Sequence, residues 1–146
     1  YKRQARTVGV GSISIEAEAL MQATEGALRA GINMARDGNH LGDISAAVQR
    51  YGESKGFGVV REYTGHGIGT EMHEDPLIPN VGMPGTGLVL KKGMVVAIEP
   101  MLNMGTWRTK VSGDNWTVKT ADGRLSAHFE NTIVINDGDP EVLTVE

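Results

Sequence analysis

The sequence has no cysteine among its 146 residues, and only 5% of its residues are aromatic. Without cysteine, a chain forms no disulfide framework and no zinc–thiolate site, and it has no thiol nucleophile. No apolar run approaches the roughly 18 residues that a membrane-spanning helix needs, and no apolar signal core follows the charged amino terminus. We therefore expect a cytoplasmic protein that binds no membrane.

Basic residues are also few, with 14 lysines and arginines against 18 acidic residues. The one cationic cluster consists of Lys2, Arg3 and Arg6. A nucleic-acid-binding protein usually carries a basic face, so we predict no nucleic-acid binding. The length and the hydrophobic content of 40% are those of one soluble globular domain, residues 1–146. Because the sequence begins with Tyr1 rather than methionine, we expect a processed, trimmed or partial chain.

Apolar residues at spacings of three and four predict two helices. The first is expected over residues 15–36, after an N-cap at Ser14. The second is expected over residues 41–55, with Gly56 as its C-cap and Asp43 in its first turn. A carboxylate there interacts with the positive end of the helix dipole, so we interpret Asp43 as structural.

Runs of β-branched and apolar residues predict strands, and Pro- and Gly-rich runs predict loops. Strands are expected at 7–13, 57–63, 94–99, 116–119 and 125–135. The last two are expected to form a hairpin through residues 121–123, and residues 77–92 are expected to form a surface loop. Two helices beside antiparallel strands indicate the α+β class.

One segment, Tyr63–Pro76, holds two of the four histidines, His66 and His73. His66 lies among alternating glycines, and such a run is poorly suited to a helix or a central strand. Glycine at these positions indicates unusual backbone angles or a close approach of another group. Both histidines are ordinary loop residues in one interpretation; in the other, His66 is a metal ligand or an acid–base group and His73 a second polar group beside it.

Two isolated acids, Glu99 and Glu130, lie within apolar strand-like runs farther along the chain. Carboxylates in such surroundings are rarely buried unless they are paired or bound to a metal. Together with His66 they make half of a metal coordination shell. The periodicity around Glu130 is imperfect, so it does not decide which face of its strand Glu130 occupies.

Several separate motifs resemble the type I methionine aminopeptidases, members of the pita-bread metallopeptidase fold. They run in the family's order through nearly the whole chain and comprise residues 6–7, 43–44, 56–57, 59–63, 63–81, 98–100, 114–117 and 129–132. The resemblance implies the second half of that fold, in which two helices cover one face of a curved antiparallel sheet. It also implies that the chain is the carboxy-terminal part of the catalytic domain.

The resemblance implies a role for each motif residue. His66, Glu99 and Glu130 are expected to bind metal, and His73 and Glu99 to be catalytic. Substrate contacts are expected from His66, His73, Met72 and Trp116, the last two lining the pocket for the methionine side chain. Core packing is the alternative for Met72 and Trp116.

The implied reaction removes the amino-terminal methionine of nascent proteins and peptides through attack of a metal-bound hydroxide on the first peptide bond. Mixed His and carboxylate ligands suit manganese, iron, cobalt or zinc and do not select among them. The family binds two ions per complete site. The family's relation to protein synthesis makes the ribosome a possible partner, and an open sheet edge makes self-association possible.

The sequence departs from the family at two metal ligands. Aligned on Arg6 and Thr7, the family's second ligand aspartate falls at Arg3, and its first falls before Tyr1. A cation at Arg3 repels a metal ion, so we expect at most one ion, bound weakly, and little catalysis unless the missing segment is supplied from elsewhere. The rival hypotheses are a prolidase or aminopeptidase P, and a catalytically incomplete fragment or module that binds a peptide or protein.

Overall fold

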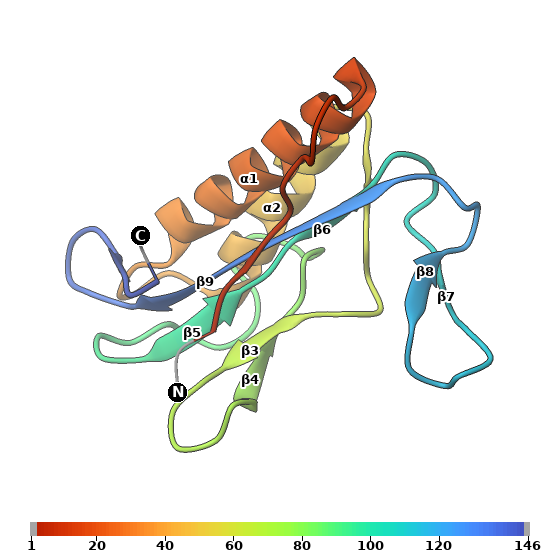
Figure 1. Ribbon diagram of the computed structural model, residues 1–146. Coiled ribbons are helices and arrows are strands. Elements are labelled where there is room, and N and C mark those ends of the chain that lie inside the picture. Colours follow the sequence, from red (N-terminus) through yellow and green to blue (C-terminus); the bar gives the residue numbers. More distant parts are fainter. Residues whose placement is uncertain (1–2, 145–146) are drawn as a thin grey trace.

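The computed structural model describes residues 3–144 and has two helices on one face of an antiparallel sheet (Figure 1). This arrangement confirms the α+β class. The helices are α1 (Ile15–Met34) and α2 (Leu41–Ser54). The strands are β1 (Ala5–Arg6), β2 (Gly58–Val59), β3 (Gly65–Gly67), β4 (Glu74–Ile78), β5 (Val95–Ile98), β6 (Met101–Asn103), β7 (Thr109–Val111), β8 (Val118–Thr120), β9 (Ser126–Val134) and β10 (Glu141–Val142). Within residues 3–144, no helix is long and apolar enough to cross a bilayer.

The sheet is built around β9, its longest strand. The strand order is β2-β6-β9-β5-β3-β4, and β1 and β10 also pair with β9. Every pairing is antiparallel. The separate β7–β8 hairpin projects away from the helices (Figure 1). The open sheet therefore has β2 and β4 at its two ends.

The core lies between the helices and the sheet. It takes alternate residues from the strands, including Val96 and Ile98 of β5 and Phe129 and Ile133 of β9. Because side chains in a strand alternate between faces, the neighbouring residues point to the other face of the sheet. Glu130 is thereby placed on the face opposite the helices, which the sequence pattern had left undecided.

The helix predictions are confirmed to within two residues. The Ser14 hydroxyl accepts a hydrogen bond from the Ala17 N–H, as expected of an N-cap. The Asp43 carboxylate accepts hydrogen bonds from the N–H groups of His40, at 2.7 Å, and Gly85, at 2.8 Å. These two bonds, the His40 bond first, lower the pKa of Asp43. Asp43 therefore ties the start of α2 to the loop before β5, which supports its structural interpretation.

Several strand predictions were wrong. Residues 7–13 form no strand, since Gly11 takes a positive φ and the side chains of Val8 and Val10 are exposed. The expected strand over 57–63 shrinks to Gly58–Val59, and β4 includes the first residues of the expected loop. The expected hairpin between 116–119 and 125–135 does not form, because β8 pairs with β7 and β9 pairs within the main sheet.

The glycine-rich segment also corrects an expectation, because β3 lies in the interior of the sheet between β4 and β5. A Cβ atom at Gly65 would overlap the carbonyl oxygen of Ala97, and one at Gly67 would overlap that of Asp75. Glycine here permits close approach of the neighbouring strands. The glycines thus build a tightly packed strand that presents His66.

Replacing Asp43 with alanine should destabilise the protein by about 1 kcal/mol at neutral pH, since the start of α2 loses its carboxylate acceptor. The lowered folded-state pKa means that this stabilisation is present above the unfolded pKa and is lost as the pH falls through the folded pKa. Urea unfolding of wild type, Asp43→Ala and Asp43→Asn from pH 7 to pH 3 measures this. A wild-type advantage over Asp43→Ala that is as large at pH 3 as at pH 7 would contradict the role of the charge.

Candidate metal centre

Strands β3 and β9 and the residue that follows β5 bring His66, Glu99 and Glu130 together on the face of the sheet opposite the helices. The strand register pairs His66 with Ala97 and Ala97 with Thr132, so Glu99 and Glu130 fall in the next row. Ligand atoms of the three residues all lie within 4.8 Å of one another. Their exposed fractions are 2%, 7% and 1%. The sequence-predicted ligand set is therefore one buried cluster.

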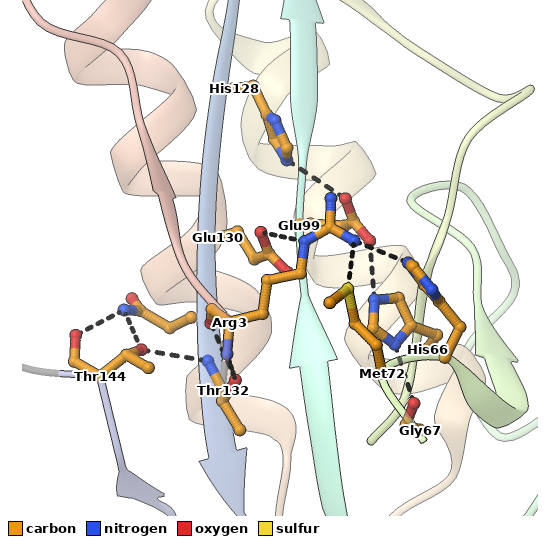
Figure 2. Close-up of polar contacts among 11 residues, drawn as sticks. Arg3, His66, Gly67, Met72, Glu99, His128, Glu130, Thr132 and Thr144 are labelled. Carbon is orange, nitrogen blue, oxygen red and sulfur yellow. Dashed lines mark hydrogen bonds and ion pairs between the residues drawn. The ribbon is translucent and has the colours of Figure 1, made fainter. Parts of the chain in front are cut away.

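His66 is oriented by its own strand. Its Nδ1 lies 2.8 Å from the carbonyl oxygen of Gly67, which can only accept, so Nδ1 carries the hydrogen (Figure 2). In the neutral ring, Nε2 then holds a lone pair and faces Glu99 Oε1 at 3.4 Å. Two acceptor atoms facing each other in a buried place need a cation or a proton between them.

The carboxylate of Glu130 is buried and has no hydrogen-bond partner at either oxygen. Burial, followed by the nearby negative charge of Glu99, raises the pKa of Glu130. Four of the five buried side-chain atoms that lack such a partner within residues 3–144 belong to His66, Glu130 and His128. These buried atoms without a hydrogen bond, and the mixed nitrogen and oxygen donors, fit a divalent cation.

Arg3 places a fixed positive charge beside this cluster. Its Nε lies 3.3 Å from Glu130 Oε2, and its Nη1 lies 3.9 Å from the sulfur of Met72 (Figure 2). The same Nη1 lies 2.6 Å from His73 Nε2. Because Arg has no acceptor, His73 Nε2 accepts this hydrogen bond. Thr132 holds the Arg3 backbone, accepting from its N–H at 2.9 Å and donating to its carbonyl at 2.8 Å. The guanidinium therefore engages a candidate ligand and the candidate catalytic histidine at once.

The cluster borders a cavity of about 700 Å³. His66, His73, Glu99 and Arg3 are among its lining residues, and the rings of His66 and His73 lie 4.3 Å apart. Met72 is exposed beside Arg3 and is not among the residues that line the cavity. Trp116 is 87% exposed in the turn between β7 and β8, and the cavity lining includes Val118 of that hairpin instead. The structure thus gathers the predicted polar residues but leaves Trp116 outside.

Sequence reasoning missed His128, which also lines the cavity and has its Nε2 3.3 Å from Glu99 Oε2. The available signal was its spacing of two residues from Glu130, which puts both side chains on one face of a strand. That signal needs the strand and its buried face to be known first.

Comparison with known proteins gives a consistent result. The model of the family described as "Metallopeptidase family M24" matches residues 1–137. The methionine aminopeptidase of Clostridium perfringens is 56% identical over 141 residues, which are 97% of this chain and 57% of that protein. The chain therefore spans a little over half the length of that relative.

Solved structures give the same picture. The methionine aminopeptidase from Rickettsia prowazekii superimposes with a TM-score of 0.97 at 45% identity, covering 99% of this chain and 59% of that one. The Xaa-Pro dipeptidase from Bacillus anthracis has a TM-score of 0.71 at 26% identity, covering 97% and 34%. The similarity is therefore greater to the methionine aminopeptidase than to the Xaa-Pro enzyme.

Replacing Glu130 with glutamine should stabilise the metal-free protein at neutral pH, because burial and Glu99 oppose the charge on Glu130. A raised folded-state pKa means that the contribution of Glu130 to stability is full below the unfolded pKa and is lost as the pH rises through the folded pKa. The advantage of Glu130→Gln over wild type should therefore vanish toward pH 4. Urea unfolding in the presence of a chelator checks this, and an advantage that grows on acidification would contradict it.

Replacing Arg3 with alanine should tighten divalent-metal binding on the order of tenfold, or about 1.4 kcal/mol. This is a fraction of the roughly 4 kcal/mol between two unit charges 4 Å apart at an effective dielectric constant of 20. Calorimetric titration of Mn²⁺ measures it. Arg36→Ala is the control, because it removes the same charge from an exposed pair with Asp139. Equal affinities for wild type and Arg3→Ala would show that Arg3 does not oppose the ion.

Proposed function

Because this chain belongs to metallopeptidase family M24, we propose that residues 1–146 form the carboxy-terminal part of a methionine aminopeptidase catalytic domain. Its fold is the pita-bread fold of the structures it matches. The observation that carries the proposal is the buried cluster of His66, Glu99 and Glu130, whose donor atoms lie within 4.8 Å of one another. The proposed activity is removal of the amino-terminal methionine from nascent proteins and peptides.

His66 Nε2, Glu99 Oε1 and the Glu130 carboxylate are the proposed metal ligands. The ion is manganese, iron, cobalt or zinc, and we propose at most one per chain because Arg3 occupies part of the cluster. A bound divalent cation supplies Lewis acidity and lowers the pKa of a water molecule that it binds. The Glu99 carboxylate borders the cluster and is also the proposed proton acceptor, through an oxygen lone pair that the ion would leave free.

His73 is the proposed hydrogen-bond donor to the carbonyl oxygen of the scissile peptide bond. Its ring lies beside that of His66, at the border of the cavity. Since its Nε2 accepts from Arg3, the hydrogen of the neutral ring is on Nδ1. Donation from Nε2 therefore requires that Arg3 leave His73.

The methionine side chain of the substrate is proposed to contact Met72 and Trp116. Support for Met72 comes from its position beside Arg3, and support for Trp116 from the β7–β8 hairpin, whose Val118 reaches the cavity. Proposed substrates carry a small second residue. Binding to the ribosome and self-association stay predictions from the sequence, as does a cytoplasmic location.

The position of Arg3 favours a second candidate function. In this second function, the chain has an incomplete catalytic site and binds a peptide or protein partner in the cavity. The supporting observation is that the Arg3 guanidinium contacts both Glu130 and His73. The two candidates differ in turnover rather than in fold.

Titration of Mn²⁺ into the metal-free chain should show one ion per chain. His66→Ala should weaken binding by at least about 100-fold, beyond the 10- to 100-fold loss typical of residues that only support ligands. Glu25→Ala, which removes an exposed carboxylate paired with Arg29, should leave binding unchanged. Binding that survives His66→Ala unaltered would overturn the proposed site.

The same metal-loaded sample should release methionine from Met-Ala-Ser, and His73→Ala should slow this release on the order of 100-fold, as for the loss of a donor to a developing oxyanion. Preference for an Xaa-Pro peptide would contradict the proposed specificity. Metal binding without any turnover would support the incomplete-site alternative.

A further inference from the structure

His128 lies at the cavity, but the proposed function gives it no role. It precedes Glu130 by two residues on β9, so both side chains project from the face opposite the helices. Its Nε2 is buried, lacks a hydrogen-bond partner and lies 3.3 Å from Glu99 Oε2, while the side chain as a whole is 32% exposed. In Figure 2, His128 and His66 approach the Glu99 carboxylate from opposite sides.

The backbone of His128 is fixed by a residue far away in sequence. The Thr7 hydroxyl accepts from the His128 N–H and donates to the His128 carbonyl, each at 2.9 Å. One hydroxyl can do both, because it has one hydrogen and two lone pairs. The backbone that carries the ring is therefore held in place, and the ring lies beside the Glu99 carboxylate.

We propose that His128 is a positioning residue: its Nε2, which lies 3.3 Å from Glu99 Oε2 without a hydrogen bond in this structure, reorients to donate one to that oxygen and so turns Glu99 Oε1 toward the metal cluster. Each oxygen of the Glu99 carboxylate lies near a different histidine. Oε1 is 3.4 Å from His66 Nε2, and Oε2 is 3.3 Å from His128 Nε2. A carboxylate oxygen only accepts, so the neutral His128 ring must carry its hydrogen on Nε2. Held in this way, Glu99 offers one oxygen to an ion.

The same geometry argues against His128 as a direct ligand. Among residues 3–144, the ligand atoms that all lie within 4.8 Å of one another belong to His66, Glu99 and Glu130, and His128 is not part of this group. His128 is thus close to one candidate ligand and acts through it. Mutating a residue that supports a metal ligand in this way typically lowers the metal affinity 10- to 100-fold.

This inference rests on the proposed metal centre, so its test has one measurement that needs no metal. Long-range ¹H–¹⁵N NMR of the metal-free chain near pH 8 reports which ring nitrogen of His128 is protonated. The expected result is the Nε2–H tautomer, with a His128 ¹⁵N shift that changes in Glu99→Ala. A dominant Nδ1–H tautomer would overturn the proposal whatever the chain does with metal.

The second measurement is titration of Co²⁺ together with its visible absorption spectrum. We expect His128→Ala to lose 10- to 100-fold in affinity and to change the spectrum, because Glu99 becomes free to rotate. His128→Gln, whose amide NH₂ lies at a similar reach, should return both to within about threefold of wild type. Ser126→Ala, two residues earlier on the same strand, is the control.

The failures are distinguishable. Wild-type affinity and spectrum in a folded His128→Ala would overturn the positioning role and leave the metal centre intact. A wild-type chain that binds no Co²⁺ would overturn the metal centre, and the NMR measurement would then still decide the position of the His128 hydrogen.

Discussion

Two carboxylates buried side by side constrain the rest of this structure. Glu99 directly follows β5 and Glu130 lies on the neighbouring β9, and burial together with the charge of Glu99 opposes the charge on Glu130. A buried charge persists only with a partner of opposite sign or a change in protonation. Here the partners are His66, His128 and Arg3, which surround the carboxylates from β3, β9 and the segment before β1.

The two faces of the sheet have different roles in placing these charged residues. Its helix-facing side supplies an apolar core, and the alternate residues of the same strands supply the cluster. Glycines in β3 let its backbone approach both neighbours, and threonine hydroxyls join the amino-terminal segment to β9 on either side of β1. The backbone of Arg3 is consequently held beside the cluster, and its side chain reaches Glu130 from there.

The sequence predicted those features that depend on contacts between residues close together in the chain. The helices, the cap at Ser14 and the first-turn role of Asp43 follow from spacing and hydrogen bonding within a few residues. The residue types at His66, Glu99 and Glu130 predicted a cluster, which strand pairing then brought together. Strand partners could not be predicted, because β8 pairs with β7 through contacts that its own sequence does not specify. His128 was missed for the same reason, since its role depends on which face of β9 is buried.

The central claim is that one divalent ion and the Arg3 guanidinium compete for the same carboxylate. Anomalous diffraction from a crystal of the chain soaked in Mn²⁺ tests it most directly. The account predicts one peak in contact with His66 Nε2, Glu99 and Glu130, with the Arg3 side chain moved away from Glu130. A peak elsewhere, or an ion bound at the cluster with Arg3 still paired to Glu130, would contradict it.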